Sequence, residues 1–188
     1  MNAPLDLMLD KQAFLQWVQR QEGRFELKNG QVIMHPGGTK RHAWIIGAFV
    51  TAFRTRLDLS IWCVGPTDIA IEIGPDIRYP DVVVERIQDD GTALSTQTPT
   101  VLVEVLSPSS VGTDMTAKAA EYTSLPSLEA YIVASQEEPI CWIWQRGGPE
   151  RSFPPSPEEV AGRNKTVEIN ALGVSLPMAE IFRGIGSA

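Results

Sequence analysis

The 188-residue sequence has few of the features that mark membrane, secreted or zinc-binding proteins. Its apolar runs are interrupted well before membrane-spanning length, so we expect no transmembrane helix and no membrane partner. The first residues show neither a basic start nor a long apolar segment, which argues against a signal peptide and favours a cytoplasmic protein. The two cysteines, Cys63 and Cys141, are isolated and lack C-x-x-C spacing. We therefore expect reduced thiols and no zinc site.

An excess of positive charge, which is typical of nucleic-acid-binding proteins, is also missing, because the net charge is −7. The charges are nevertheless unevenly distributed. Residues 1–57 contain eight basic and four acidic side chains, whereas the rest of the chain contains eight basic and 19 acidic ones. This asymmetry fits a basic face beside an acidic metal site, and it equally fits ordinary solvated surface charge.

The length and the apolar content of 43% predict a single domain, spanning residues 1–188, with a substantial core. Hydrophobic periodicity predicts helices that are interleaved with strands, and hence an α/β or α+β fold built on a single sheet. The Asn29-Gly30 pair predicts a β-hairpin. The expected elements are helices over 11–20, 40–57 and 113–124, the hairpin over 24–35, strands over 61–64, 68–73, 79–85, 101–106, 130–134 and 139–146, and a surface loop over 147–165.

The strongest candidate for a functional residue is a glutamate inside an apolar strand. Residues 101–106 form a continuous apolar run of strand length, which is typical of a strand that is buried on both faces. Glu104 lies in the middle of this run. A lone ionised glutamate there would cost roughly several kcal/mol unless it is paired or coordinates a metal. The alternative to a catalytic role is a structural ion pair with Lys118.

A second acid, Asp81, directly follows Pro80 at the start of a β-branched run. Because proline can open a strand but is excluded from the middle of a central one, we expect Asp81 at the mouth of a strand, near solvent. Lys118 lies on the helix that follows the Glu104 strand, with Asp114 and Tyr122 at i, i+4 spacing on the same face. Asp81 could alternatively be an ordinary strand-start acid, and Lys118 an ordinary surface lysine.

Two strand carboxylates with a lysine nearby suit the hydrolysis of a phosphodiester. Mg²⁺, or Mn²⁺ in its place, binds through one or two carboxylates, while waters and substrate oxygens complete the octahedron. The metal polarises the phosphate and lowers the pKa of a water molecule. We predict Asp81, Glu104 and the backbone carbonyl of Val105 as metal ligands. Lys118 would hold the attacking water or the developing charge, with Tyr122 one turn further along the helix.

Two more polar residues lie beside apolar ones. His42 is expected near the start of a helix, at the edge of its apolar face, either as a hydrogen-bonded and partly buried side chain or as a catalytic one. Glu26 lies on the first hairpin strand, opposite in direction to Phe25 and Leu27. It is interpreted either as a surface acid or as a site residue.

Three segments form a recognisable pattern: FEL at 25–27, YPDVVV at 79–84 and VEVLSPS at 103–109, the last followed by Asp114, Lys118 and Tyr122. This pattern resembles the Uma-two endonuclease family of the restriction-endonuclease-like PD-(D/E)XK superfamily, over about residues 10–145. The resemblance implies a mixed central sheet flanked by helices, with an N-terminal helix and a β-hairpin. It further implies a Mg²⁺-dependent nuclease centre that acts on DNA, with Asp81 and Glu104 as ligands, Glu26 as a site acid and His42 as a further candidate.

One position departs from the superfamily pattern. The superfamily places its lysine two residues after the second acid, where this sequence has Leu106. Lys118 would therefore supply the lysine from the following helix. By analogy with nucleases that cut both strands, we also expect a homodimer. The alternative function is a non-catalytic DNA-binding or assembly module that retains the nuclease fold, which the acidic net charge favours.

Overall fold

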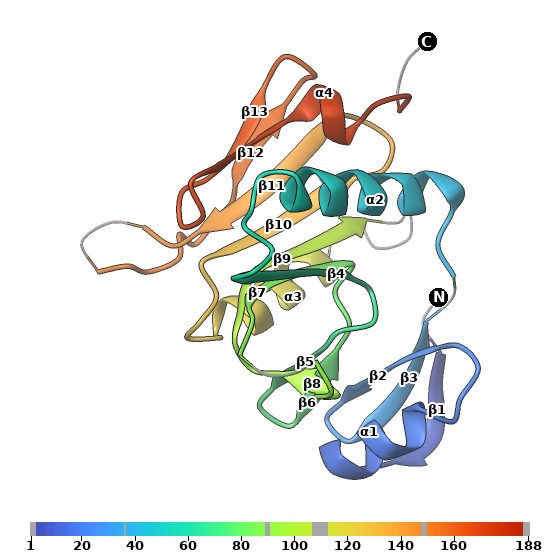
Figure 1. Ribbon diagram of the computed structural model, residues 1–188. Coiled ribbons are helices and arrows are strands. Elements are labelled where there is room, and N and C mark those ends of the chain that lie inside the picture. Colours follow the sequence, from blue (N-terminus) through green and yellow to red (C-terminus); the bar gives the residue numbers. More distant parts are fainter. Residues whose placement is uncertain (1–2, 36, 89–90, 107–112, 148–149, 186–188) are drawn as a thin grey trace.

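Two six-stranded sheets and a two-stranded hairpin organise the part of the chain that the structure describes (Figure 1). The structure is a computed structural model and describes residues 3–35, 37–88, 91–106, 113–147 and 150–185. The elements in chain order are β1 (Ala3–Met8), α1 (Lys11–Val18), β2 (Arg24–Lys28), β3 (Gln31–His35), α2 (Lys40–Arg54), β4 (Trp62–Pro66), β5 (Ala70–Ile73), β6 (Asp76–Arg78), β7 (Val82–Arg86), β8 (Ser95–Thr96), β9 (Pro99–Leu106), α3 (Thr113–Thr123), β10 (Ala130–Ser135), β11 (Ile140–Gln145), β12 (Glu158–Ala161), β13 (Thr166–Ile169), β14 (Val174–Pro177) and α4 (Met178–Ile181).

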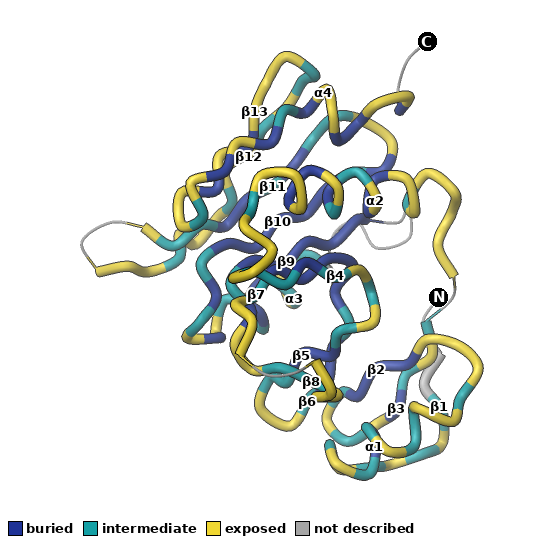
Figure 2. The backbone as a smooth tube through the Cα atoms, viewed as in Figure 1, coloured by how far each residue is buried: buried dark blue, intermediate teal, exposed yellow. Residues whose placement is uncertain are grey.

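The central sheet has the strand order β12-β11-β10-β9-β7-β4. Its strands β9 and β10 run parallel, and its other neighbouring strands run antiparallel. Helix α2 covers one face of this sheet, where its apolar residues pack against the odd-numbered valines of β9, and α3 covers the opposite face. Figure 2 shows the buried residues following β9, β10 and β11 through the middle of the molecule. Because β9 is covered on both faces, its apolar run continues without alternation.

The N-terminal sheet has the strand order β1-β3-β2-β6-β5-β8 and packs against α1. The β2–β3 hairpin turns at Asn29 and Gly30, whose φ angles are 50° and 79°. Positive φ at both central residues defines a two-residue turn that matches the twist of the strands, which explains why the asparagine–glycine pair is found here. The hairpin brings Glu26 in the middle of β2 and His35 at the end of β3 toward the central sheet.

The structure bears out the predicted helices and hairpin and corrects three other expectations. Asp10 caps α1 and Thr39 caps α2 through their side chains. The expectation of a single sheet is wrong, because two six-stranded sheets are present. The expected surface loop 147–165 contains β12, an edge strand that pairs with β11. Strands β1, β6 and β8 were not predicted, because β1 pairs with β3 across the intervening α1 and β2, and β6 and β8 have only three and two residues.

The cysteines and the lengths of the helices both bear on expectations from the sequence. Cys63 and Cys141 form no disulfide. Among the described residues, no helix combines the length and the apolar character needed to cross a membrane.

Candidate active site

Strands β7 and β9 bring the two predicted acids together. Val82, the first residue of β7, pairs with Val103 in this antiparallel ladder, so Asp81, which directly precedes β7, lies opposite Glu104. Residues opposite each other on neighbouring strands have their side chains on the same face and close together. The Val105 N–H donates a hydrogen bond to Asp81 Oδ2 at 2.7 Å, which ties the two strands at this point. Asp81 therefore lies next to Glu104 from a strand that is remote in sequence.

His42 packs against Asp81 from the first turn of α2. Its Nε2 lies 3.2 Å from Asp81 Oδ2. Burial lowers the pKa of His42, but the hydrogen bond and the charge of Asp81 outweigh this effect and hold the pKa above its ordinary value. Asp81 itself is only 7% exposed, so the expectation of a position near solvent is wrong. The His42 imidazole and the Val105 N–H of β9 both contact Asp81 Oδ2.

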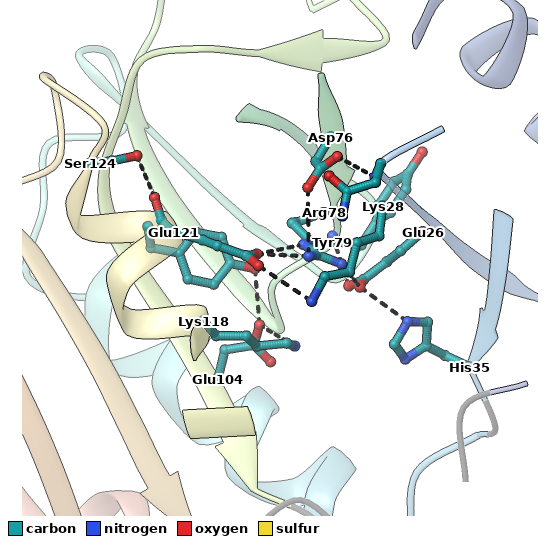
Figure 3. Close-up of polar contacts among 12 residues, drawn as sticks. Glu26, Lys28, His35, Asp76, Arg78, Tyr79, Glu104, Lys118, Glu121 and Ser124 are labelled. Carbon is teal, nitrogen blue, oxygen red and sulfur yellow. Dashed lines mark hydrogen bonds and ion pairs between the residues drawn. The ribbon is translucent and has the colours of Figure 1, made fainter. Parts of the chain in front are cut away.

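Helix α3 supplies two donors to Glu104, and both use the same carboxylate oxygen. Lys118 Nζ donates to Oε1 at 2.9 Å (Figure 3). Tyr122 OH donates to the same oxygen at 3.0 Å. Burial lowers the pKa of Lys118, but Glu104, Glu26 and Asp81 outweigh it and hold the pKa well above its ordinary value. Lys118 is therefore an ammonium group. Burial and the charges of Asp81 and Glu26 raise the pKa of Glu104, against the effect of Lys118.

A second cluster of charges joins the N-terminal sheet to α3 (Figure 3). Arg78 on β6 is 3% exposed. It donates to Glu26 at 3.0 Å and, with two nitrogens, to Glu121 at 3.0 and 2.7 Å. Lys28 lies 3.5 Å from Glu121, and His35 Nε2 lies 3.0 Å from Glu26 Oε2. Sequence reasoning identified only Glu26 of these residues.

Glu26 belongs to the site electrostatically. It is buried, which overturns its interpretation as a surface acid. Burial alone would raise its pKa, but His35, Lys118 and Arg78 together lower the pKa to about 2. Glu26 in turn contributes to the raised pKa of Lys118. The N-terminal hairpin therefore helps to keep the lysine of α3 charged.

The lowered pKa of Glu26 predicts a pH dependence of stability. The carboxylate is favoured in the folded state, so its stabilising effect is complete above the ordinary pKa of 4.5 and is lost as the pH falls toward 2. Urea unfolding measures the free energy of unfolding of the wild type and of Glu26→Gln at each pH. The advantage of the wild type over the variant should shrink by up to about 3 kcal/mol as the pH falls over this interval. A difference that stays constant between pH 5 and pH 2.5 would contradict the assignment.

Asp81 and Glu104 each have one carboxylate oxygen that is available to a hard divalent cation. Asp81 Oδ1 and Glu104 Oε2 accept no hydrogen bond from the described residues. Within that part of the chain, no group of three or more histidine, cysteine, aspartate or glutamate side chains is placed to hold a metal. Mg²⁺ requires only one or two carboxylates, because waters and phosphate oxygens supply the rest. The site therefore suits Mg²⁺ or Mn²⁺ better than a closed zinc site.

Two parts of the expected motif lie outside the described residues: the Ser107-Pro108-Ser109 segment and the side chain of Asp114. Leu106, which occupies the position of the superfamily's lysine, is buried against the apolar residues under α3. Lys118 reaches the acid from α3 instead, which is the arrangement expected from the sequence. The predicted metal contact of the Val105 carbonyl stays a prediction.

A hollow of about 510 Å³ lies near the opposite ends of β7 and β9. It is lined by residues that include Arg86, Thr100, Glu129 and Arg146, and by none of the charged residues described above. Its arginines are engaged locally: Arg86 lies over the Trp62 ring, and Arg146 donates to backbone carbonyls. The hollow is therefore separate from the candidate active site.

Three comparisons relate the chain to known proteins. A model of the family described as "Putative restriction endonuclease" (Uma2) matches residues 12–179, which extends beyond the expected limit near residue 145. The uncharacterized protein slr1290 from Synechocystis sp. is 28% identical over 180 residues, covering 94% of this chain and 93% of its own length.

A solved structure from Anabaena variabilis, described as "a putative nuclease belonging to DUF820", gives a TM-score of 0.73 at 14% identity. The alignment covers 93% of this chain and 97% of the other chain. At this identity the likeness concerns the fold, and it confirms the predicted nuclease-like mixed sheet flanked by helices.

Proposed function

Because the chain belongs to the Uma2 family, described as "Putative restriction endonuclease", we propose that it is a Mg²⁺-dependent endonuclease that hydrolyses phosphodiester bonds in DNA. The observation that carries the proposal is the pairing of two buried acids, Asp81 and Glu104, from neighbouring strands, with the Lys118 ammonium 2.9 Å from Glu104. In a metal-dependent nuclease, carboxylates hold the metal ion and a nearby positive charge stabilises the charge that develops on the phosphate. These groups therefore have to lie close together.

Asp81, Glu104 and the Val105 carbonyl would hold Mg²⁺ or Mn²⁺, which when bound polarises the phosphate and lowers the pKa of a water molecule. The protein supplies the remaining chemistry. Tyr122 and Lys118 occupy Glu104 Oε1, so this carboxylate presents its other oxygen. The Lys118 ammonium stabilises the negative charge that develops on the phosphate, and Glu26 helps to keep it protonated. His42 orients Asp81.

The proposal predicts metal-dependent cleavage that requires Asp81. Purified protein should nick or linearise plasmid DNA with Mg²⁺ or Mn²⁺, and a chelator should abolish the cleavage. Asp81→Asn should lower the rate by at least about a hundredfold, because it removes one of the two anionic ligands. Asp58→Asn, which changes a fully exposed acid near the end of α2, serves as the control. Cleavage that is equal in wild type and Asp81→Asn, or absent on single- and double-stranded DNA alike, would refute the proposal.

A second candidate function, a non-catalytic DNA-binding or assembly module, is favoured by the Lys118–Glu104 ion pair, because this pair neutralises Glu104 within the protein itself. Calorimetric titration with Mn²⁺ separates the two. Heat of binding that vanishes in Glu104→Ala supports the metal centre, and no binding supports the module. Cleavage of both DNA strands by one centre per chain further implies a homodimer, which light scattering in the presence of DNA would detect.

A further inference from the structure

The start of α2 has the features of an anion-binding site. This helix of 15 residues has no acid in its first turn and carries Lys40, Arg41 and His42 there instead. Acidic residues are normally favoured at this end, where the helix dipole is positive and backbone N–H groups lack partners. Thr39 satisfies one of these groups by accepting a hydrogen bond from the His42 N–H at 3.1 Å. The other N–H groups of the first turn and Lys40 favour a negatively charged ligand, whereas Arg41 and His42 pair with Glu137 and Asp81.

Gln136 lies against this helix start and carries a donor without an acceptor. It follows β10 directly and is 2% exposed. Its Oε1 accepts a hydrogen bond from Thr39 Oγ1 at 2.7 Å. Its Nε2 is buried and has no hydrogen-bond partner among the described residues. Thr39 accepts from His42 and gives its single proton to the Gln136 oxygen, which leaves the amide nitrogen for another group. An unsatisfied buried donor of this kind calls for an acceptor that the protein does not supply.

The helix start is in direct contact with the candidate active site. His42 Nε2 lies 3.2 Å from Asp81 Oδ2. On its other side, the His42 ring packs against Gly38, where a Cβ would approach Nδ1 to 2.7 Å. Arg41 pairs with Glu137 at 2.6 Å, so two successive residues after β10 hold the start of α2. Gln136, the α2 start and Asp81 therefore form one contiguous cluster.

We propose that the Gln136 amide and the first turn of α2 bind a backbone phosphate of DNA, next to the phosphate that is cleaved at Asp81 and Glu104. The identity of the ligand rests on the proposed function. A phosphate oxygen supplies the acceptor that Gln136 Nε2 lacks, and Lys40 adds positive charge. Contacts of this kind fix the register of the strand and carry no base preference. Because Nε2 is covered by its neighbours, binding includes a local side-chain shift.

Gln136→Glu tests the subsite against a merely structural role. The glutamate keeps an oxygen for Thr39 but replaces the amide donor with an oxygen that repels phosphate. Binding of a fluorescein-labelled DNA duplex is measured by anisotropy in a Glu104→Gln background, so that no cleavage intervenes. We expect the Kd to rise about tenfold or more, since hydrogen bonds to charged groups are strong. Gln136→Met, which carries no charge, should show a similar loss. Unchanged affinity in both variants overturns the inference.

A second measurement keeps the inference testable if either variant folds poorly, as judged by circular dichroism. Each phosphate of the duplex is replaced in turn by a neutral methylphosphonate. Protein that carries only Glu104→Gln should lose affinity most strongly when the phosphate at one particular position is replaced. Protein that also carries Gln136→Met should lose no further affinity when that same phosphate is replaced. Equal losses at every position overturn the subsite. DNA binding that depends on Gln136 without any cleavage refutes the nuclease alone, whereas cleavage by the wild type with unchanged DNA binding in both Gln136 variants refutes the subsite alone.

Discussion

Replacement of Glu104 by glutamine should lower metal-dependent DNA cleavage by about a thousandfold. The substitution removes the negative charge and keeps the shape of the side chain. Lys118 and Tyr122 can still donate to the remaining oxygen, since both use a single oxygen of Glu104. Asp81 would then be the one carboxylate left to hold Mg²⁺. Single-turnover rates with excess protein over DNA isolate this effect from product release.

The matched control for this experiment is Glu72→Gln. Glu72 lies on β5, is partly buried and pairs with Lys11 at 2.8 Å, so it resembles Glu104 in its ion pair but lies in the N-terminal sheet. This variant should cleave at the wild-type rate. If Glu104→Gln retains more than about a tenth of the wild-type rate, the role of Glu104 in holding the metal is wrong. The Lys118–Glu104 pair would then be structural, as in the alternative function.

The placement of Glu104 and Asp81 could be predicted because each breaks a local rule. Glu104 interrupts an apolar strand, and Asp81 follows a proline that opens one. Violations of this type mark functional sites, where local preferences conflict with the fold. Asp81 directly precedes β7 and Glu104 lies on β9, and these two strands pair in the central sheet with only the short strand β8 between them in the sequence. The predicted start of the second helix at residue 40 agrees with α2, which Thr39 caps through its hydroxyl.

Arg78 and Glu121 could not be found in this way. Arg78 bonds to residues that are 43 and 52 positions away, and it lies in a strand of three residues with no periodicity to measure. Glu121 looks like an ordinary surface acid of an amphipathic helix. Only the pairing of β6 with β2 buries the arginine, and pairing between remote strands is not encoded locally. The division of the strands into two sheets was missed for the same reason. Gln136, likewise, is polar and next to a turn, which normally indicates exposure.

The buried arginine leads to the second large effect. Arg78→Met should lower the free energy of unfolding by about 3–5 kcal/mol, because it leaves Glu26 and Glu121 facing each other without their shared cation. Urea unfolding at pH 7, followed by circular dichroism, measures the loss. The control is Arg151→Met, which removes an arginine bonded to Glu129 at 2.7 and 2.8 Å but with a side chain that is 70% exposed. It should cost less than about 1 kcal/mol.

Both arginines bond carboxylates at 2.7–3.0 Å, but Arg78 is buried and bridges two carboxylates, whereas Arg151 is exposed and bonds one. The comparison therefore tests burial together with this bridging role. In the exposed pair, water replaces the lost partner, whereas the Glu26 carboxylate, whose side chain is 6% exposed, stays desolvated when Arg78 is removed. The double variant Arg78→Met with Glu26→Gln should therefore be more stable than Arg78→Met alone, since it removes the stranded charge. If the double variant is less stable than the single one, the loss comes from packing rather than from charge.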